Sequence, residues 1–524
     1  MVITALGQSK IQRKLGYSAQ SVSNENIQNS GQDNIVNALN GNVAGVNIVS
    51  SSGAAGASAN IVIRGASSIL GNNQPLFVID GIPIDNSTDP SNETGSVNGL
   101  DFKDYGKVIG SNRAADINPD DIASLTVLKG GVATALYGIR AVNGAIIITT
   151  KSGLGLEEGL NLNFSPGYSV DVVNKYPQFT DKYARGRNGL YSNITHWSWG
   201  PAYADNPNFP SGTTLDFDGN GSKEDVSGQP IALYRGNYKN FFQNGFKTNN
   251  NVSVSKATDA GSFYMSLGNI NQEGVLENNT YQRSNFSLKG SFNVNENFKI
   301  GGLANFANIK AVNFQGGDTG YGSGLSYYHH MWDIKNRPWI DSNSERTWFS
   351  AFVADPKWIV NEEGENSEVD RLVGNINLSY NFFPWLRLNA IGGIDTFSDQ
   401  RKLVRPISSV NTVGRNGDLY EIKTNSKDVT FNVNVSGDLS INDDLSFNYL
   451  AGLDYYDKKY NRLFLSGTEL LVKNFNDISN AKNYNANRID ANKRIVGFFG
   501  ELNFDYKNFL FLSITGRNGC NNYN

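Results

Sequence analysis

Apolar and polar residues alternate along most of the chain after residue 159. Leu160, Leu162 and Phe164 are separated by polar residues, and segments 375–382 and 429–436 repeat the pattern. A period of two is typical of β-strands with one apolar and one polar face. A soluble β-sandwich would show the same alternation, so this pattern alone leaves the surroundings open. Eleven strands are predicted, beginning near residues 160, 248, 262, 282, 298, 368, 385, 427, 445, 493 and 508.

The links between these strands alternate in length. Short turns at one end and long loops at the other are typical of an outer-membrane barrel, whose turns face the periplasm. Aromatic residues beside the short turns suit a girdle at the membrane interface, so a membrane barrel is favoured over a sandwich. The short links are 257–261, 293–297, 383–384, 441–444 and 505–508, and the mostly long ones are 171–247, 272–281, 313–366, 400–424 and 460–491. The girdle residues are Phe298, Phe382, Phe383, Trp385, Tyr506 and Phe509.

The first 155 residues instead predict a compact α/β segment. Residues 118–121 read Asn-Pro-Asp-Asp, a helix start with acids near the positive end of the helix dipole. In 76–84, an Asp80-Gly81 turn separates two short strands. The other expected elements are helices at 33–39 and 133–137 and strands at 43–48, 61–65, 124–128 and 145–150. No helical pattern is predicted after residue 153.

Composition narrows the function classes. A net charge of −4 and a pI of about 5.6 provide no basic field for nucleic acid. One cysteine, Cys520, excludes an internal disulfide framework, and three histidines leave little material for metal or triad chemistry. No apolar run reaches 18 residues, which excludes a transmembrane helix, whereas strands that are apolar on one face give only a weak hydropathy signal.

Four stretches of the first 153 residues carry a family resemblance through their order and spacing. They read NALNGNVAGVNI, IRGASS, PLFVIDGIPI and NPDDIASLTVLKGGVATALYGIRAVNGAIIITTKSG. Together they resemble the plug domain of SusC/RagA-type TonB-dependent outer-membrane transporters. Ile139 and Val142 depart from the family's GSRAANG pattern without adding charge, and Arg64, Lys129 and Arg140 suit ion pairs within the plug or to the barrel wall. The plug-motif residues are Arg64, Gly65, Asp80, Gly81, Lys129, Gly130, Tyr137, Gly138, Arg140, Asn143 and Gly144.

The resemblance implies an α+β plug domain followed by antiparallel transmembrane β-barrel strands. It divides the chain into a partial TonB box (1–7), a plug (8–155) and the N-terminal half of a barrel (156–524). In the box remnant, Val2, Ile3, Thr4 and Ala5 would pair with TonB by adding a strand to its sheet. Eleven strands are about half of the family's 22-stranded barrel, and no signal peptide follows Met1. We therefore expect a fragment of a longer outer-membrane protein.

By the same resemblance, the expected function is active import of oligosaccharides or peptides, without covalent chemistry. TonB, energised through ExbB and ExbD, would remodel the plug, and a SusD-like surface lipoprotein would close over the cargo. Outer-membrane lipid would surround the barrel. A siderophore-type receptor and a surface glycan-binding adhesin remain alternatives. A carbohydrate-active enzyme would need two carboxylates about 5–9 Å apart, which no sequence spacing fixes.

Long loops hold the residues predicted to meet cargo. Six of seven tryptophans lie there, and exposed aromatic rings stack on sugars or peptide side chains. The densest cluster, residues 327–332, is expected to face the lumen, although packing within the loops is an alternative. The candidate cargo-binding residues are Trp197, Trp199, Tyr327, Tyr328, His329 and Trp332.

One loop has a calcium-like spacing. Asp216, Asp218 and Asn220 alternate in a Gly-rich segment, as in the first half of a calcium loop. The twelfth position is Ser227 instead of glutamate, and an ordinary Asp/Gly turn is the simpler interpretation. No other cofactor is expected.

Overall fold

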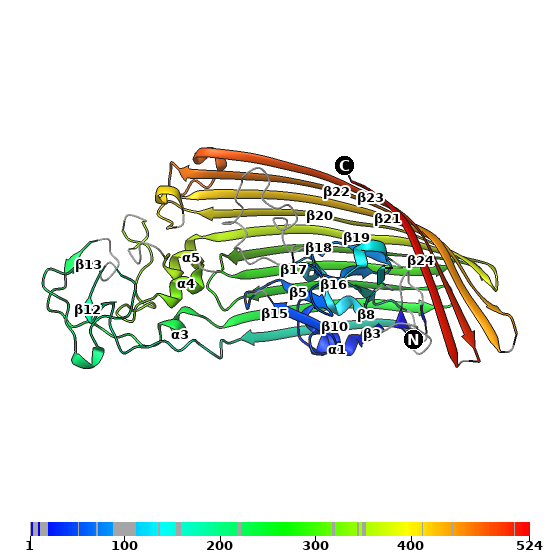
Figure 1. Cartoon of the computed structure of the whole chain (residues 1–524), viewed down its shortest axis with the longest axis horizontal. Helices are drawn as coiled ribbons and strands as arrows, with labels where there is room; N and C mark the ends of the chain where they lie inside the picture. Colours follow the sequence, from blue (N-terminus) through cyan, green and yellow to red (C-terminus); the bar gives the residue numbers. More distant parts are fainter. Residues whose placement is uncertain are drawn as a thin grey trace.

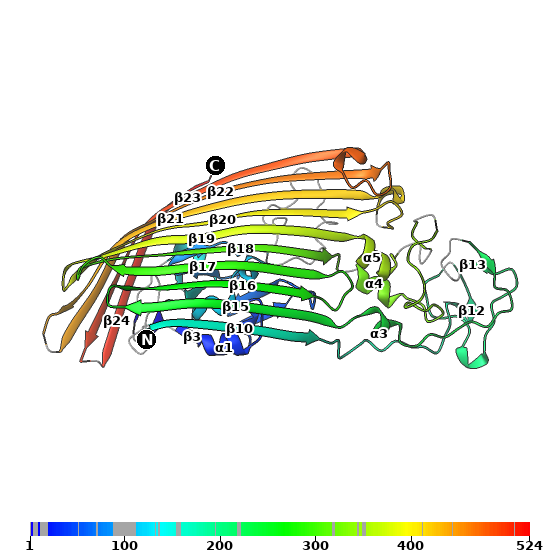
Figure 2. The same ribbon diagram turned by 180° about the vertical axis from the view of Figure 1, so that it is seen from behind.

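The computed structural model describes most of the chain. The described residues are 2–3, 9–10, 19–50, 52–69, 72–86, 112–130, 133–134, 137–153, 159–193, 195–216, 222–316, 320–342, 345–347, 353–410, 412–442, 444–507 and 509–523. Two units are visible, a small α/β plug and a long curved sheet that holds it in its concave side (Figure 1). Seen from behind, the same sheet covers the plug (Figure 2).

The plug is built on a five-stranded sheet in the order β3-β8-β9-β6-β7. Strands β6 and β9 are parallel and the other neighbours are antiparallel. Buried apolar residues of this sheet, such as Phe77 and Ile148, form the plug core. The strands are β3 (Ala19–Ser23), β6 (Leu76–Ile79), β7 (Ile82–Ile84), β8 (Ile122–Leu128) and β9 (Ala145–Thr150). Beside them lie α1 (Asn24–Asn29) and the hairpin of β4 (Val46–Ser50) and β5 (Ala59–Ile63).

Local chemistry explains where these elements begin and end. Asp80 (φ 44°) and Gly81 (φ 90°) both have positive φ, as a tight two-residue hairpin turn between β6 and β7 requires. Asn118 caps the 3₁₀ turn Pro119–Asp121 by accepting a hydrogen bond from the Asp120 amide. Gly45, at φ 71°, turns the chain before β4, so this strand begins at Val46, later than predicted.

Two other plug predictions differ in detail. The helix expected at 33–39 is only the 3₁₀ turn Asn37–Leu39, which ends because Asn40 is extended. In the segment expected to be helical at 133–137, the described residues 133, 134 and 137 are helical, and the 3₁₀ turn Gly138–Ala141 follows.

The curved sheet, called the wall below, contains eleven strands, as predicted. Each pairs antiparallel with its neighbour along the chain. Among the described residues, its first and last strands, β10 and β24, are not paired with each other. The strands are β10 (Gly159–Asp171), β15 (Gly245–Thr258), β16 (Gly261–Glu273), β17 (Thr280–Asn293), β18 (Phe298–Phe314), β19 (Gly364–Phe383), β20 (Leu386–Arg405), β21 (Asp418–Ser440), β22 (Leu445–Leu470), β23 (Ala481–Tyr506) and β24 (Leu510–Tyr523).

The polarity of the two faces of the wall is the reverse of that in a soluble protein, with the apolar face outward and the polar face inward. In β16, Phe263, Met265 and Leu267 are exposed on the convex side, whereas Tyr264 and Ser266 are buried against the plug. Strand β21 repeats this arrangement, with outward Phe431 and buried polar residues on either side. An apolar outer face and a polar inner face are what a membrane barrel requires.

The strands of the second half of the wall are longer than predicted. Strands β22 and β23 contain 26 residues each, and the expected loops at 400–424 and 460–491 shrink to 406–417 and 471–480. Segments 457–462 and 481–494 carry charged or amide side chains on both faces. The alternation therefore disappears there, but the backbone ladder continues because strand pairing does not depend on an apolar face.

Loops at one end of the wall form a second, smaller core. Three short helices, not predicted from the sequence, lie among them because five to seven residues are too few to show a helical period. They are α3 (Asn237–Phe241), α4 (Tyr321–Ser326) and α5 (Pro356–Glu362). Among the described residues, no helix has the length and apolar character needed to cross a bilayer.

Candidate functional site: the plug held against the wall

A buried arginine of the wall connects it to the plug. Arg371 of β19 lies 3.2 Å from the Asp116 carboxylate and donates to the Arg113 carbonyl oxygen at 2.7 Å. Its other nitrogens donate to Asp395 of β20 at 2.8 and 2.9 Å and to the Asp85 carbonyl oxygen at 2.8 Å. Because the ionic side chains are almost fully buried, each charge depends on the others for compensation.

Strand β17 binds the backbone of the same plug turn. Arg283 Nη1 donates to the carbonyl oxygens of Asp33, Ala115 and Ile117, at 3.1, 2.6 and 3.3 Å. Asn285 donates to the Asp116 carbonyl oxygen at 3.0 Å. Turn ends leave carbonyl groups without partners in their own segment, and here the wall supplies the missing donors.

Asp121 lies at a third contact. Its carboxylate accepts hydrogen bonds from the Tyr264 hydroxyl at 2.8 Å, the Ser266 hydroxyl at 2.5 Å and the Asn118 amide at 3.3 Å. Burial raises the pKa of the Asp121 carboxyl above its ordinary value of 3.8, against the opposing effect of these three donors.

This raised pKa predicts a pH effect on stability. A carboxyl with a raised folded-state pKa contributes stability below pH 3.8, and the contribution is lost as pH rises through the folded-state pKa. Asp121→Asn stays neutral, so its melting temperature relative to the parent is expected to increase from pH 4 to pH 7. Asp120→Asn, changing the neighbouring half-buried carboxylate, is the control for thermal scans across this range. Parallel pH profiles for parent and Asp121→Asn would contradict the effect.

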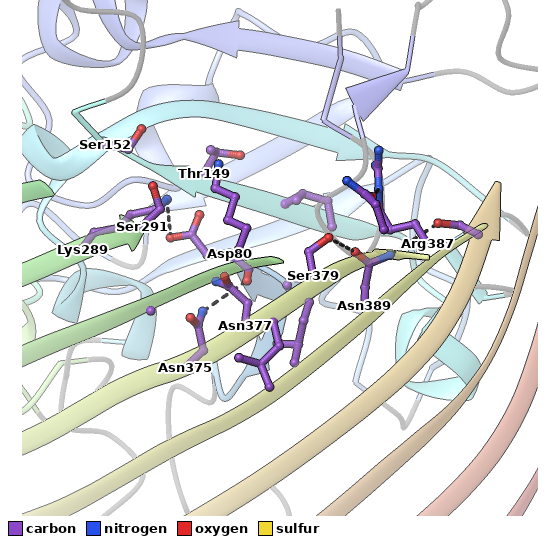
Figure 3. Close-up of a pocket in the computed structure, with 18 of the residues that line it drawn as sticks. Asp80, Thr149, Ser152, Lys289, Ser291, Asn375, Asn377, Ser379, Arg387 and Asn389 are labelled. Carbon is purple, nitrogen blue, oxygen red and sulfur yellow. Dashed lines mark hydrogen bonds and ion pairs between the residues drawn. The ribbon is translucent and has the colours of Figure 1, made fainter. Parts of the chain in front are cut away.

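The β6–β7 turn forms the fourth contact. Lys289 of β17 lies 2.9 Å from the Asp80 carboxylate and donates to the Thr150 carbonyl and hydroxyl oxygens at 3.1 and 3.0 Å. Thr150 also donates its backbone amide and hydroxyl to Asp80. The turn, the end of β9 and the wall are thus joined around one charge pair (Figure 3).

A cavity of about 870 Å³ opens beside this charge pair, near the short turns of the wall. Plug residues Thr149 and Ser152 line one side, and amide and hydroxyl side chains of the wall line the other (Figure 3). Ser379 donates to Asn389 at 3.0 Å across two of these strands. The wall residues labelled in Figure 3 are Lys289, Ser291, Asn375, Asn377, Ser379, Arg387 and Asn389.

The predicted basic residues of the plug have different partners. Arg140 lies 3.7 Å from the wall carboxylate of Asp454 and 3.9 Å above the Tyr456 ring, as the ion-pair interpretation expects. Lys129 instead donates to the Ala44 carbonyl oxygen at 2.6 Å inside the plug. For Lys129 and Arg64, no ion pair is found among the described residues.

The other plug-motif residues stabilise turns. Asn143 donates to the Asn72 carbonyl oxygen at 2.8 Å and accepts from Ser67 at 2.7 Å. Tyr137 is buried, and Gly138 lies against the Arg517 side chain of β24. Gly65, Gly130 and Gly144 have positive φ, as Gly81 does. The motif thus largely shapes the plug instead of forming one site.

Three of the predicted cargo residues are not accessible. Tyr328, His329 and Trp332 are 7, 3 and 2% exposed, so the prediction that they face the lumen is wrong. They pack in the loop core because their rings meet one another, with the Trp332 ring centre 6.2 Å from Tyr328 and 5.7 Å from His329. Tyr327, Trp197 and Trp199 are exposed, as the hypothesis requires.

Two predicted sites lie partly outside the described residues. Val2–Ile3 pairs with Ser9–Lys10 in a two-residue ladder, whereas Thr4 and Ala5 are not described. Asp218 and Asn220 of the calcium-like loop are also outside, and the described Asp216 is half-buried. In the part of the chain that the structure describes, no group of three His, Cys, Asp or Glu could hold a metal.

Of the residues that join plug and wall, the sequence analysis singled out Asp80 and Arg140 of the plug but none of their wall partners. Arg371, Arg283 and Lys289 lie on the inward, polar face of β19 and β17, where a buried or half-buried cation differs from the usual small polar residue. That inward position was a usable signal for the wall half of each contact. In the plug half, Asp80 belongs to a motif, whereas Asp116 and the carbonyl groups of the turns gave no signal.

Comparison with known proteins agrees with this geometry. A family model described as TonB-dependent Receptor Plug Domain matches residues 11–145. TonB-dependent receptor SusC of Bacteroides thetaiotaomicron is 28% identical over 545 residues, covering 99% of this chain and 48% of SusC. TonB-dependent receptor P26 of Formosa agariphila is 25% identical over 525 residues, covering 97% of this chain and 47% of P26. The chain thus spans about half the length of these curated relatives.

The fold has a solved counterpart. The structure of the RagAB peptide importer in the "open-open" state aligns with a TM-score of 0.71 at 20% identity, covering 99% of this chain and 56% of that one. A plug held by polar contacts inside an antiparallel wall defines the class of TonB-dependent receptors. Within this class, the plug motifs and the likeness to SusC make the chain similar to the SusC/RagA-type transporters.

Proposed function

We propose that this protein imports nutrients across the outer membrane in a TonB-dependent manner, with oligosaccharides or peptides as cargo. The observation that carries the proposal is the chemistry of the plug–wall interface. Many of its contacts are ion pairs and hydrogen bonds, including the ion pairs that Arg371 and Lys289 of the wall form with plug aspartates. Polar groups of this kind can exchange partners with water, so a pulled plug could shift more readily than one sealed by an apolar core.

The same proposal assigns partners to the two ends of the molecule. TonB would add a strand to the segment around Val2–Ile3, with affinity from backbone hydrogen bonds. A SusD-like surface lipoprotein would close over the loops at the opposite end. The likeness to SusC, named as a TonB-dependent receptor, supports TonB dependence, and the fold shared with RagAB, named as a peptide importer, supports nutrient cargo.

Deleting TonB is expected to reduce cargo accumulation to the background level. Cells expressing the protein from its own locus would be offered fluorescent oligosaccharides and peptides, with and without the TonB gene. Accumulation that is independent of TonB would contradict active import. Cleavage of the same compounds by the purified protein would point to an enzyme instead. Co-purification of a lipoprotein after mild detergent extraction tests the partner.

A further inference from the structure

A hollow of about 350 Å³ lies among the loops, away from the plug. It is formed by the hairpin of β11 (Gly186–Arg187) and β12 (Leu190–Tyr191) and by the neighbouring segment 197–200. β12 is labelled at the loop end of the molecule, opposite the short turns (Figure 1). The lining residues are Tyr183, Arg187, Asn188, Gly189, Trp197, Trp199 and Gly200.

The backbone beneath this hollow is fixed by close packing. A Cβ atom on Gly186 would lie 2.0 Å from the Leu190 carbonyl oxygen, and one on Gly200 would lie 2.3 Å from the Arg185 carbonyl oxygen. The buried Arg185 side chain donates to the carbonyl oxygens of Thr195 and Asn193 at 2.5 and 2.8 Å. The site is therefore largely formed before a ligand arrives, which lowers the entropic cost of binding.

Two indole rings face outward from this rigid base. Trp199 is 65% exposed and Trp197 is 44% exposed, although the nearby loop core buries Trp332 almost completely. Tyr183 stacks on Trp199, with ring centres 5.9 Å apart and planes 29° apart. Large aromatic side chains left open in a preformed hollow are typical of binding sites.

Arg187 is the one charged residue among the described residues of the lining, and it defines the polar part of the ligand. The Arg187 guanidinium lies 5.2 Å from the centre of the Trp197 ring. The described lining contains no carboxylate, and no described acidic side chain forms an ion pair with Arg187. A planar guanidinium held over an aromatic ring is well suited to binding a carboxylate through two parallel hydrogen bonds.

The backbone distinguishes a sugar from an extended peptide. A peptide bound as an added strand needs free backbone groups at a sheet edge. Here the amides of Gly186, Gly189 and Trp199 already donate to carbonyl oxygens inside the loop, at 2.9, 2.9 and 3.2 Å. The groups left to bind a ligand are therefore the aromatic ring faces and the Arg187 guanidinium. This combination suits a pyranose ring that bears a carboxylate.

We propose that this hollow is a binding subsite for a uronic acid unit of a glycan. Its indole rings stack on the sugar, and Arg187 binds the carboxylate. The subsite deepens the import function proposed above, and its role in capturing cargo rests on that function.

Binding by the purified protein in detergent tests the subsite. Calorimetry would compare a tetragalacturonate and a hyaluronan tetrasaccharide with neutral maltotetraose and an acidic tetrapeptide. Trp199→Ala is expected to weaken uronate binding at least tenfold. Arg187→Gln is expected to remove the preference for uronates over maltotetraose. Leu190→Ala changes an exposed residue of the same hairpin outside the lining and should leave binding unchanged.

Several results would overturn the subsite. Absence of binding to both uronates, equal affinity for maltotetraose, or unchanged affinity in Trp199→Ala each does so. Loss of a co-purifying lipoprotein in Trp199→Ala, without uronate binding by the parent, would assign the rings to a protein interface instead. TonB-dependent uptake without uronate binding refutes the subsite but not import. Uronate binding without TonB-dependent uptake refutes import but not the subsite.

Discussion

Replacing Arg371 with methionine is expected to destabilise the protein by about 3–5 kcal/mol, the usual cost of breaking a buried ion pair by removing one partner. The change leaves the carboxylate of Asp395 without the cation that it contacts twice, and removes one of the two arginines beside Asp116. The plug turn Arg113–Asp116 also loses a donor to its backbone. The expected readouts are faster protease cleavage of the plug and a lower temperature of the heat-induced mobility shift in gels.

Two matched variants separate this effect from general damage. Arg387→Met removes an exposed arginine of β20 that donates only to Asn381 among the described residues, and it should change neither readout. The triple variant Arg371→Met, Asp116→Asn, Asp395→Asn also removes the two carboxylates that Arg371 contacts. It should recover part of the lost stability. A plug as protected in Arg371→Met as in the parent would show that the ion network does not hold it.

Gly393→Val is the second variant with a large expected effect. A Cβ atom at this position of β20 would lie 2.3 Å from Ile82 Cδ1 of the plug. Ile82 is 1% exposed, so either its side chain or the plug hairpin must shift to relieve this contact. Overpacking of this kind costs about 1–3 kcal/mol, and more where the surroundings are rigid. In cells, the expected result is increased sensitivity to a large antibiotic such as vancomycin, because a displaced plug leaves the lumen open.

The adjacent residue provides the control. At Gly392, the nearest atom to an added Cβ is Phe431 Cδ2 at 3.7 Å, an ordinary contact distance. Gly392→Val should leave antibiotic sensitivity close to that of the parent. Equal sensitivity of the two variants would mean that disruption of the strand, and not contact with the plug, causes the leak.

The number and order of wall strands could be predicted from the sequence because an apolar outer face repeats every second residue. The prediction failed where that face ends, in 457–462 and 481–494, since a strand that is polar on both faces resembles a loop. The β6–β7 turn was predictable for a local reason: Asp80-Gly81 specifies its own backbone shape.

The contacts of the site could not be predicted in the same way. Arg371 and Asp116 are separated by 255 residues, and no local pattern records which carboxylate an inward arginine meets. The aromatic residues of 327–332 failed for a related reason. The number of aromatic residues in a loop does not show whether they are buried within the loop, as Trp332 is, or exposed to solvent, as Trp199 is.

The length of β22 and β23 has a consequence for how far the wall extends beyond the lipid. At ~3.3 Å per residue, 26 residues span ~85 Å, or ~60 Å of height at a tilt of ~45°. The apolar band of such barrels is only ~25 Å tall. With that band in the bilayer, this side of the wall extends a few nanometres beyond the lipid. If the protein imports cargo as proposed, the cargo would first meet the loops at this end of the wall, at a distance from the membrane itself.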